Sequence, residues 1–278
     1  MDQRLKSLFL VGYILLAIIT TFTAFKPFSQ GHYFATLGML MTTLPFLIFL
    51  ATLYLFNIAR TDPSLKLYST IIGLGVLVLS YSYFTERTEI NKGLGFFTAI
   101  SWLLYLKWYS VFKSRYSPLL IKGNQLPELN LMDEKGNSFN TKKLIGQKNI
   151  LMFYRGNWCP LCVTQIKELV QDYANLKEQN IQTVLISPQP QSKTKKLAER
   201  FKVDFKFLVD KDNKVARQLN IISENGLPTG LQVFGYDSDT VMPTVILTDE
   251  SGMIMHVDLT SNYRVRPEPK ELLKYFNT

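Results

Sequence analysis

Cys159 and Cys162 are the residues of this 278-residue chain best suited to chemistry, because they are its two cysteines and lie three positions apart. A disulfide-stabilised secreted scaffold carries more cysteines at wider spacing, whereas a lone pair at this spacing is typical of redox or metal sites. A zinc site needs further ligands, and neither His32 nor His256 lies in a ligand-like cluster. The spacing therefore predicts a redox-active Cys159–Cys162 disulfide, with no metal and no other cofactor.

The elements around the pair indicate how a thiolate would be stabilised. The apolar run 149–154 predicts a buried strand, and a helix should begin at about Cys159, with Pro160 in its first turn. Free backbone N–H groups and the dipole at a helix N-terminus lower a cysteine pKa from about 8.5. Arg155 is a candidate for additional positive charge. We therefore expect Cys159 to attack as the thiolate, and Cys162 to resolve the mixed disulfide.

Residues 125–278 have the pattern of an α/β domain. Apolar runs predict strands, and the amphipathic segments between them predict helices. The expected strands are 128–132, 138–140, 149–154, 183–187, 206–209, 244–248 and 253–258, and the expected helices are 160–179, 192–201, 213–219 and 269–276. This alternation indicates a central mixed sheet flanked by helices.

Residues 1–116 are instead expected to form an all-α membrane anchor, joined to the α/β domain by a linker, 117–124. The anchor contains four apolar segments, 8–25, 33–59, 67–84 and 94–112. Each is near or above the length of about 18–20 residues that crosses a bilayer. Lys and Arg are more frequent on the side of both termini, which predicts a multi-pass protein in contact with lipid and a cytoplasmic redox domain. A periplasmic redox domain is the alternative.

The residues around the cysteines resemble the thioredoxin superfamily, and more narrowly its redoxin and peroxiredoxin-like branch (alkyl hydroperoxide reductase/thiol-specific antioxidant type). The resemblance extends from about residue 123 to the C-terminus and rests on segments 126–129, 153–162, 184–187, 207–210 and 242–244. It implies a thioredoxin-like fold and a cis peptide bond between Met242 and Pro243 beside the disulfide. Trp158, Pro160, Met242 and Pro243 are then expected to border the substrate groove.

The resemblance leaves two registers open for the cysteines. In a thioredoxin-like mechanism Cys159 attacks and Cys162 resolves. In a peroxiredoxin Cys162 would take the peroxidatic position, Cys159 that of the family's threonine and Arg155 that of its proline, while the family's arginine near Pro243 is not apparent. Because activation of an O–O bond needs aligned donors, the sequence favours a thiol–disulfide oxidoreductase over an antioxidant thiol peroxidase. A redox sensor or assembly factor without turnover is a further alternative.

Other features of the sequence limit the kinds of partner that we expect. No basic stripe is interleaved with aromatic residues, so a nucleic-acid partner is not expected, and no flavin fingerprint is present. Electrons should therefore come from a thiol or disulfide protein or from a small thiol, with peroxide as the alternative oxidant. His256 is interpreted as structural. The segment 262–267, Asn-Tyr-Arg-Val-Arg-Pro, is interpreted as a solvated surface segment, although it recurs in peroxiredoxin-like relatives and could bind an anion.

Overall fold

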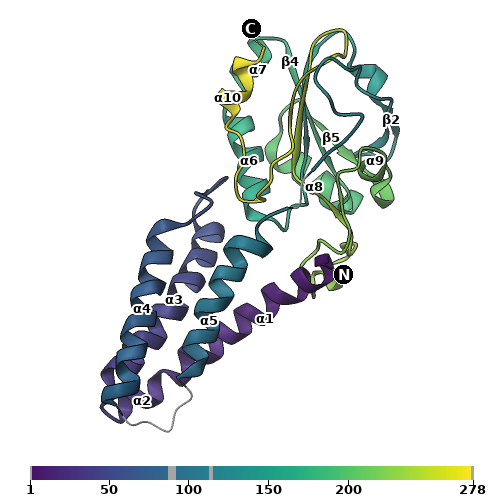
Figure 1. The fold of residues 1–278 in the computed structure, drawn as a ribbon. Coiled ribbons are helices and arrows are strands. Elements are labelled where there is room, and N and C mark those ends of the chain that lie inside the picture. The colour runs from purple at the N-terminus through teal and green to yellow at the C-terminus, as the bar shows by residue number, and fades with distance from the viewer. Residues whose placement is uncertain (1, 87–91, 113–114, 277–278) are drawn as a thin grey trace.

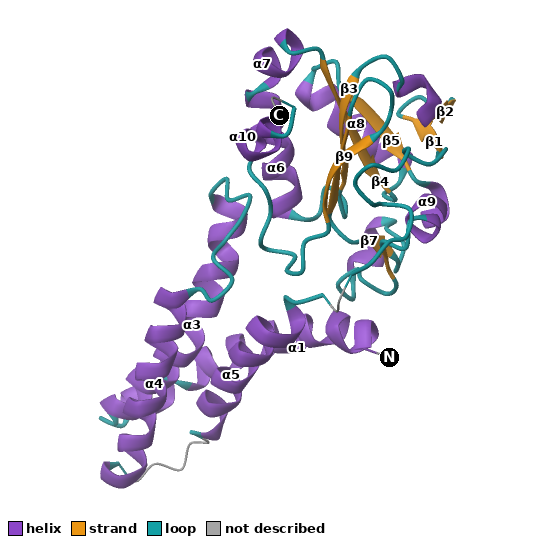
Figure 2. Ribbon diagram, turned by 45° about the horizontal axis from the view of Figure 1, so that its top comes forward, coloured by secondary structure: helices purple, strands orange, loops and turns teal. Residues whose placement is uncertain are grey.

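The computed structural model describes residues 2–86, 92–112 and 115–276, which form a helical bundle and an α/β domain (Figure 1). The bundle contains α1 (Asp2–Thr23), α2 (Phe25–Ser29), α3 (Tyr33–Leu55), α4 (Lys66–Thr85) and α5 (Gly93–Leu104), which continues as a π-helical turn, Tyr105–Tyr109. The start of α1, the end of α3, the start of α4 and the end of the π-helical turn all lie toward the α/β domain (Figures 1 and 2).

Three stretches of the described chain are long and apolar enough to cross a membrane: Gln3–Ser29, Tyr33–Leu55 and Lys66–Thr85. They correspond to the first three predicted segments. The fourth segment is also helical, but α5 has 12 residues and the π-helical turn adds 5. Four crossings therefore stay a prediction, as does the side of the membrane. Arg87 and Lys113, two of the basic residues behind the predicted orientation, lie outside the described residues.

Helices α3 and α4 pack closely because glycines leave room for the neighbouring backbone. A Cβ atom added at Gly38 would lie 2.7 Å from the backbone nitrogen of Leu79, and one at Gly75 would lie 2.7 Å from the Cβ atom of Met41. Small residues at such contacts favour helix association where lipid provides no hydrophobic driving force.

The α/β domain is built on a seven-stranded mixed sheet with strand order β2-β1-β5-β4-β3-β8-β9. Strands β3, β4 and β5 are parallel, and the remaining pairs are antiparallel. The strands are β1 (Asn130–Asp133), β2 (Ser138–Asn140), β3 (Lys148–Phe153), β4 (Ile181–Ser187), β5 (Lys206–Val209), β8 (Thr244–Thr248) and β9 (Ile254–Asp258). All seven predicted strands are confirmed, and the fold is the expected thioredoxin-like α/β domain.

Side chains alternate along the central strands, so the sheet has two buried faces. One face packs on α6 (Pro160–Gln171), α8 (Gln191–Phe201) and α10 (Pro269–Lys274), and the other packs on α9 (Lys214–Gln218). The predicted helix 160–179 is interrupted at Asp172, whose backbone leaves the helical conformation, and continues as α7 (Tyr173–Glu178). A two-stranded sheet, β6 (Ile222–Ser223) with β7 (Thr240–Val241), was not predicted because each strand has only two residues.

The segment 262–267 joins the two domains, so its interpretation as a solvated surface is wrong. The side chain of Arg264 is 0% exposed. Its guanidinium donates hydrogen bonds to Ser110 Oγ (3.1 Å), Thr61 Oγ1 (2.8 Å), Asp62 O (3.0 Å) and Pro63 O (2.9 Å). These acceptors belong to the end of the bundle, and they satisfy a buried cation that would otherwise be costly. The surface interpretation failed because the polar groups that solvate Arg264 come from the other domain.

The chain already packs on the α/β domain just before the expected linker begins. Phe112 N–H donates to Ser261 O at 2.7 Å, and Arg115 donates to Pro243 O at 2.8 Å and Thr260 O at 3.0 Å. The chain therefore contacts the α/β domain before residue 117, the start of the expected linker. The domain boundaries themselves stay a prediction.

Candidate redox site

The two cysteines lie where strand β3 passes into helix α6, as the sequence predicts. Cys159 is the residue that precedes the helix, and Pro160 is its first residue. The turn before it depends on Gly156, whose φ is +145° and where a Cβ atom would lie 2.7 Å from Trp158 Nε1. Gly156 O accepts a hydrogen bond from Cys159 N–H at 3.2 Å. The turn thus fixes the approach to the first thiol.

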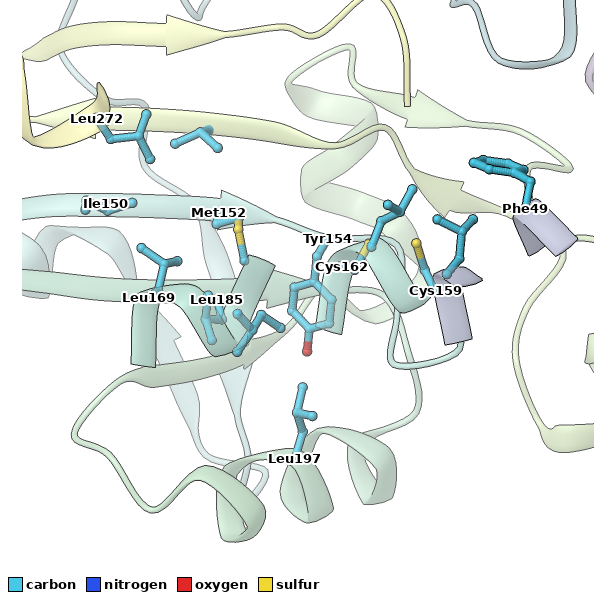
Figure 3. Close-up of a cluster of buried hydrophobic side chains, with 14 of the residues drawn as sticks. Phe49, Ile150, Met152, Tyr154, Cys159, Cys162, Leu169, Leu185, Leu197 and Leu272 are labelled. Carbon is cyan, nitrogen blue, oxygen red and sulfur yellow. The ribbon is translucent and has the colours of Figure 1, made fainter. Parts of the chain in front are cut away.

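Both cysteines are free thiols and both are buried, with exposed fractions of 3% for Cys159 and 0% for Cys162. They belong to a hydrophobic cluster that includes Phe49 and Leu53 of α3. Figure 3 shows Phe49 on the side of Cys159, with Tyr154 beside Cys162. The end of the bundle therefore covers the thiol pair.

Arg266 is the functional residue that the sequence interpretation missed. Its side chain is 5% exposed, and its Nη2 donates toward Cys159 Sγ at 4.0 Å. The guanidinium also lies within hydrogen-bonding reach of the Cys162 sulfur. Hydrogen bonds to Gln165 Oε1 (3.1 Å) and Tyr263 O (3.0 Å) hold it in place. The recurrence of the segment in peroxiredoxin-like relatives was the sequence signal that could have identified it.

The surroundings distinguish the two thiols electrostatically. The hydrogen bond to Cys162, burial and the negative charge of Cys162 raise the pKa of Cys159. Burial would raise the pKa of Cys162 as well, but three groups together lower it well below 9.0: the Cys159 S–H donor, the Arg266 charge and the backbone N–H of Arg155. These groups favour the thiolate at Cys162 over a thiolate at Cys159. Which of the two cysteines attacks first stays a prediction.

The charge of Arg155 has a smaller effect on the two thiols than the charge of Arg266. Its guanidinium lies over the ring of Trp158, 4.7 Å from the ring centroid, and 5.8 Å from that of Tyr263. It donates a hydrogen bond to Gly226 O. The Arg155 charge lowers the pKa of both thiols, and it is the last of the favourable effects on each.

The expected substrate groove is only partly assembled. Trp158 and Pro160 line a cleft of about 360 Å³ between the end of α3 and helices α6 and α8, whereas Met242 and Pro243 are not among its lining residues. The expected cis bond at Met242–Pro243 is also wrong, since no peptide bond of the described residues is cis. Met242 N–H donates to Ile221 O at 2.8 Å, so the strand entry at Pro243 is held by main-chain pairing.

In the part of the chain that the structure describes, no three His, Cys, Asp or Glu side chains are grouped to hold a metal ion. His256 stacks on the ring of Tyr275, with centroids 3.9 Å apart. Burial, with the nearby charge of Lys122, lowers the His256 pKa, which favours the neutral imidazole of a packed residue.

Comparison with known proteins gives two kinds of relative. The thiol-disulfide oxidoreductase ResA of Halalkalibacterium halodurans is 26% identical over 173 residues, 62% of this chain and 87% of that protein. Peroxiredoxin Bcp of Escherichia coli is 27% identical over 135 residues, 49% of this chain and 83% of that protein. The crystal structure of Enterococcus faecalis AhpC is 18% identical and covers 57% of this chain and 90% of its own, with a TM-score of 0.47.

A model of a protein family also matches this chain. The match extends over residues 122–257, which include both cysteines, the central strands and Pro243. The relatives act in thiol redox chemistry, so the α/β domain is that of an oxidoreductase. Residues 122–257 of this chain form a domain of the AhpC/TSA family.

Proposed function

We propose that this chain is a membrane-anchored thiol peroxidase in which Cys162 attacks the peroxide and Cys159 resolves the product. One observation carries the proposal: the buried Arg266 guanidinium, whose Nη2 lies 4.0 Å from Cys159 Sγ, also reaches the Cys162 sulfur, and it favours a thiolate there together with the Cys159 thiol and the Arg155 backbone N–H. The same donors are placed to stabilise the charge that develops as an O–O bond breaks. The sequence interpretation did not find these donors because Arg266 lies 104 positions after Cys162 in the chain.

The chemistry balances with these two residues. The Cys162 thiolate takes one peroxide oxygen and becomes a sulfenic acid, while the other oxygen leaves as an alcohol or water after protonation. The Cys159 thiol then attacks the Cys162 sulfenic acid, which releases water and forms the disulfide. Because the two residues are one helical turn apart, the second step needs no partner chain.

Burial also favours a small oxidant. Cys162 is 0% exposed, and Phe49 and Leu53 of α3 lie in the cluster around it. A disulfide carried by a protein would have to displace the end of α3 before reaching either sulfur. A peroxide only needs a narrow path.

Dithiol–disulfide exchange is the second candidate. It is supported by Cys159 at the helix start beside a cleft lined by Trp158 and Pro160, and by the relative named as a thiol-disulfide oxidoreductase. In that mechanism Cys159, which is the more exposed sulfur, attacks first.

Membrane anchoring is part of the proposal. Four helical segments run between the α/β domain and the far end of the bundle, and three of them are long and apolar enough to span a bilayer (Figure 1). An even number of crossings would leave the N-terminus and the redox domain on one side. The excess of Lys and Arg on that side supports the cytoplasm.

The test measures peroxide consumption by the full chain in detergent with dithiothreitol as reductant, together with a sulfenic-acid trap. We expect Cys162→Ser to abolish consumption, and Cys159→Ser to accumulate sulfenic acid at Cys162. Modification at Cys159 in the Cys162→Ser variant, with insulin reduction by the wild type, would instead establish disulfide exchange.

A further inference from the structure

The side chains that line the cleft beside Cys159 have no role in the peroxidase step proposed above. It lies between the end of α3, which contributes Leu53, Tyr54, Phe56 and Asn57, and the facing sides of α6 and α8. Trp158 and Pro160, the neighbours of Cys159 on both sides, form part of its wall. Any molecule seated there therefore contacts the two residues that flank Cys159, which is itself buried and is not among the lining residues.

Positive charge dominates the cleft. Lys167, Lys196 and Arg200 line it, and none of its described lining residues is an Asp or Glu. Lys167 is held by a hydrogen bond from Nζ to Asn57 Oδ1 at 2.6 Å, so its ammonium is fixed between the two domains. A cleft lined by one sign of charge raises the local concentration of the opposite ion and its rate of association.

The size of the cleft and the cover on the thiols limit the occupant. A volume of about 360 Å³ accepts a small molecule rather than a protein segment with its flanking surface. Leu53 of α3 lies in the cluster that buries Cys159, so the face that would receive a protein disulfide is occupied by the bundle. The reductant that reaches the oxidised pair must then be small, and the lining charges select an anion.

We propose that the reductant of this site is an anionic low-molecular-weight thiol, which enters through the cleft and attacks Cys159; this inference rests on the proposed function. Its thiolate attacks Cys159 Sγ of the disulfide, forms a mixed disulfide there and releases Cys162 as the thiolate that Arg266 stabilises. A second molecule attacks the mixed disulfide, leaves as the small-molecule disulfide and returns Cys159 to the thiol after proton uptake. Two small thiols are oxidised for each protein disulfide reduced.

The experiment compares reduction of the oxidised full chain in neutral detergent by three probes: 3-mercaptopropionate, 2-mercaptoethanol and cysteamine. Rates are divided by the thiolate concentration of each probe, so that the remaining difference reports charge. We expect the anionic probe to react at least about tenfold faster than the neutral one, the cationic probe to be slowest, and the preference to fall with salt.

The variant Lys196→Glu/Arg200→Glu reverses two of the cations on the exposed side of α8. We expect it to lose the preference for 3-mercaptopropionate about tenfold or more and to leave the rate with 2-mercaptoethanol within about twofold. The matched control Lys195→Glu/Lys177→Glu changes the net charge equally with residues outside the cleft lining, and should react as the wild type does.

Equal corrected rates for the three probes, or equal loss of preference in the variant and its control, would overturn the inference. In the second case the preference would come from net charge and not from the cleft. Peroxide consumption with dithiothreitol separates the two proposals: its absence in the wild type removes the peroxidase, whereas its presence without charge selection removes only the anionic reductant.

Discussion

Replacement of Arg266 by glutamine tests the central electrostatic claim, because it removes the charge nearest to the thiols while keeping a polar side chain. The Arg266 Nη2 atom lies 4.0 Å from Cys159 Sγ, and the guanidinium also reaches Cys162. At an effective dielectric constant of about 20, a charge pair at about 4 Å interacts by about 4 kcal/mol. Since about 1.4 kcal/mol corresponds to a factor of ten, loss of Arg266 should reduce the ratio of thiolate to thiol at Cys162 by up to about a thousandfold. Arg155 remains in the variant, so a tenfold loss is the lower expectation.

The assay follows alkylation of Cys162 by iodoacetamide as a function of pH in a Cys159→Ser background, where the serine hydroxyl preserves a hydrogen-bond donor. We expect Arg266→Gln to move the midpoint of the profile to higher pH and Arg266→Lys to move it less, because lysine retains the charge but not the planar guanidinium. The midpoint is compared rather than the maximal rate, so that a change in access to the buried sulfur is separated from a change in ionisation. An unchanged midpoint in Arg266→Gln would refute the assignment of Arg266 as the stabilising charge.

Three further predictions concern pH, the domain junction and the bundle. Because the pKa of Cys162 is lowered, its thiolate persists at pH values below the ordinary cysteine pKa. The rate constant for its oxidation by peroxide, measured by stopped flow, should therefore be nearly constant from pH 9 to pH 7. The rate constant of an unperturbed thiol with a pKa of about 8.5 would fall roughly 25-fold over the same range. Arg264→Met removes four hydrogen bonds at the junction of the two domains. It should lower the free energy of unfolding of the full chain by about 3 kcal/mol or more and speed the labelling of Cys159 by a bulky maleimide. A labelling rate equal to that of the wild type would contradict the role of Arg264 in holding the end of the bundle over the thiols. Gly75→Ala places a methyl group 2.7 Å from a neighbouring side-chain carbon and should lower the midpoint of thermal unfolding in detergent, while Gly73→Ala, with nothing within 4 Å, provides the control and should not.

Much of the α/β domain could be predicted because its signals are local. The run 149–154 is short and apolar, which predicts a buried strand, and Pro160 is a residue that the first turn of a helix tolerates. The strand, the turn and the helix around Cys159 could therefore be predicted from neighbouring residues. The interruption at Asp172 was missed because the apolar periodicity continues across it.

The site itself could be predicted only in part, because its electrostatics depend on residues that are distant in the chain. Arg266 lies beside the cysteines because the chain turns back toward them after β9. No residue near position 159 in the sequence indicates this contact. The hydrophobic cluster that Cys159 shares with Phe49 and Leu53 depends on how the bundle meets the α/β domain, which no periodicity describes. The helix start alone therefore could not show the Arg266 charge that favours a thiolate at Cys162.

The charge arrangement also determines how strongly the oxidised pair accepts electrons. Arg266 is 5% exposed, and apart from the two sulfurs its hydrogen-bond acceptors are the neutral groups Gln165 Oε1 and Tyr263 O, so a Cys162 thiolate is the strongest negative charge acting on it. Formation of the disulfide removes that negative charge and leaves the buried cation less well compensated, which stabilises the reduced state relative to the oxidised one. Arg266→Gln should therefore make the disulfide harder to reduce, by about 30 mV in reduction potential for every 1.4 kcal/mol of lost interaction. Equilibration of the wild type and the variant with defined ratios of oxidised and reduced dithiothreitol measures this directly, and a potential that does not fall in the variant would contradict the coupling between Arg266 and the Cys162 thiolate.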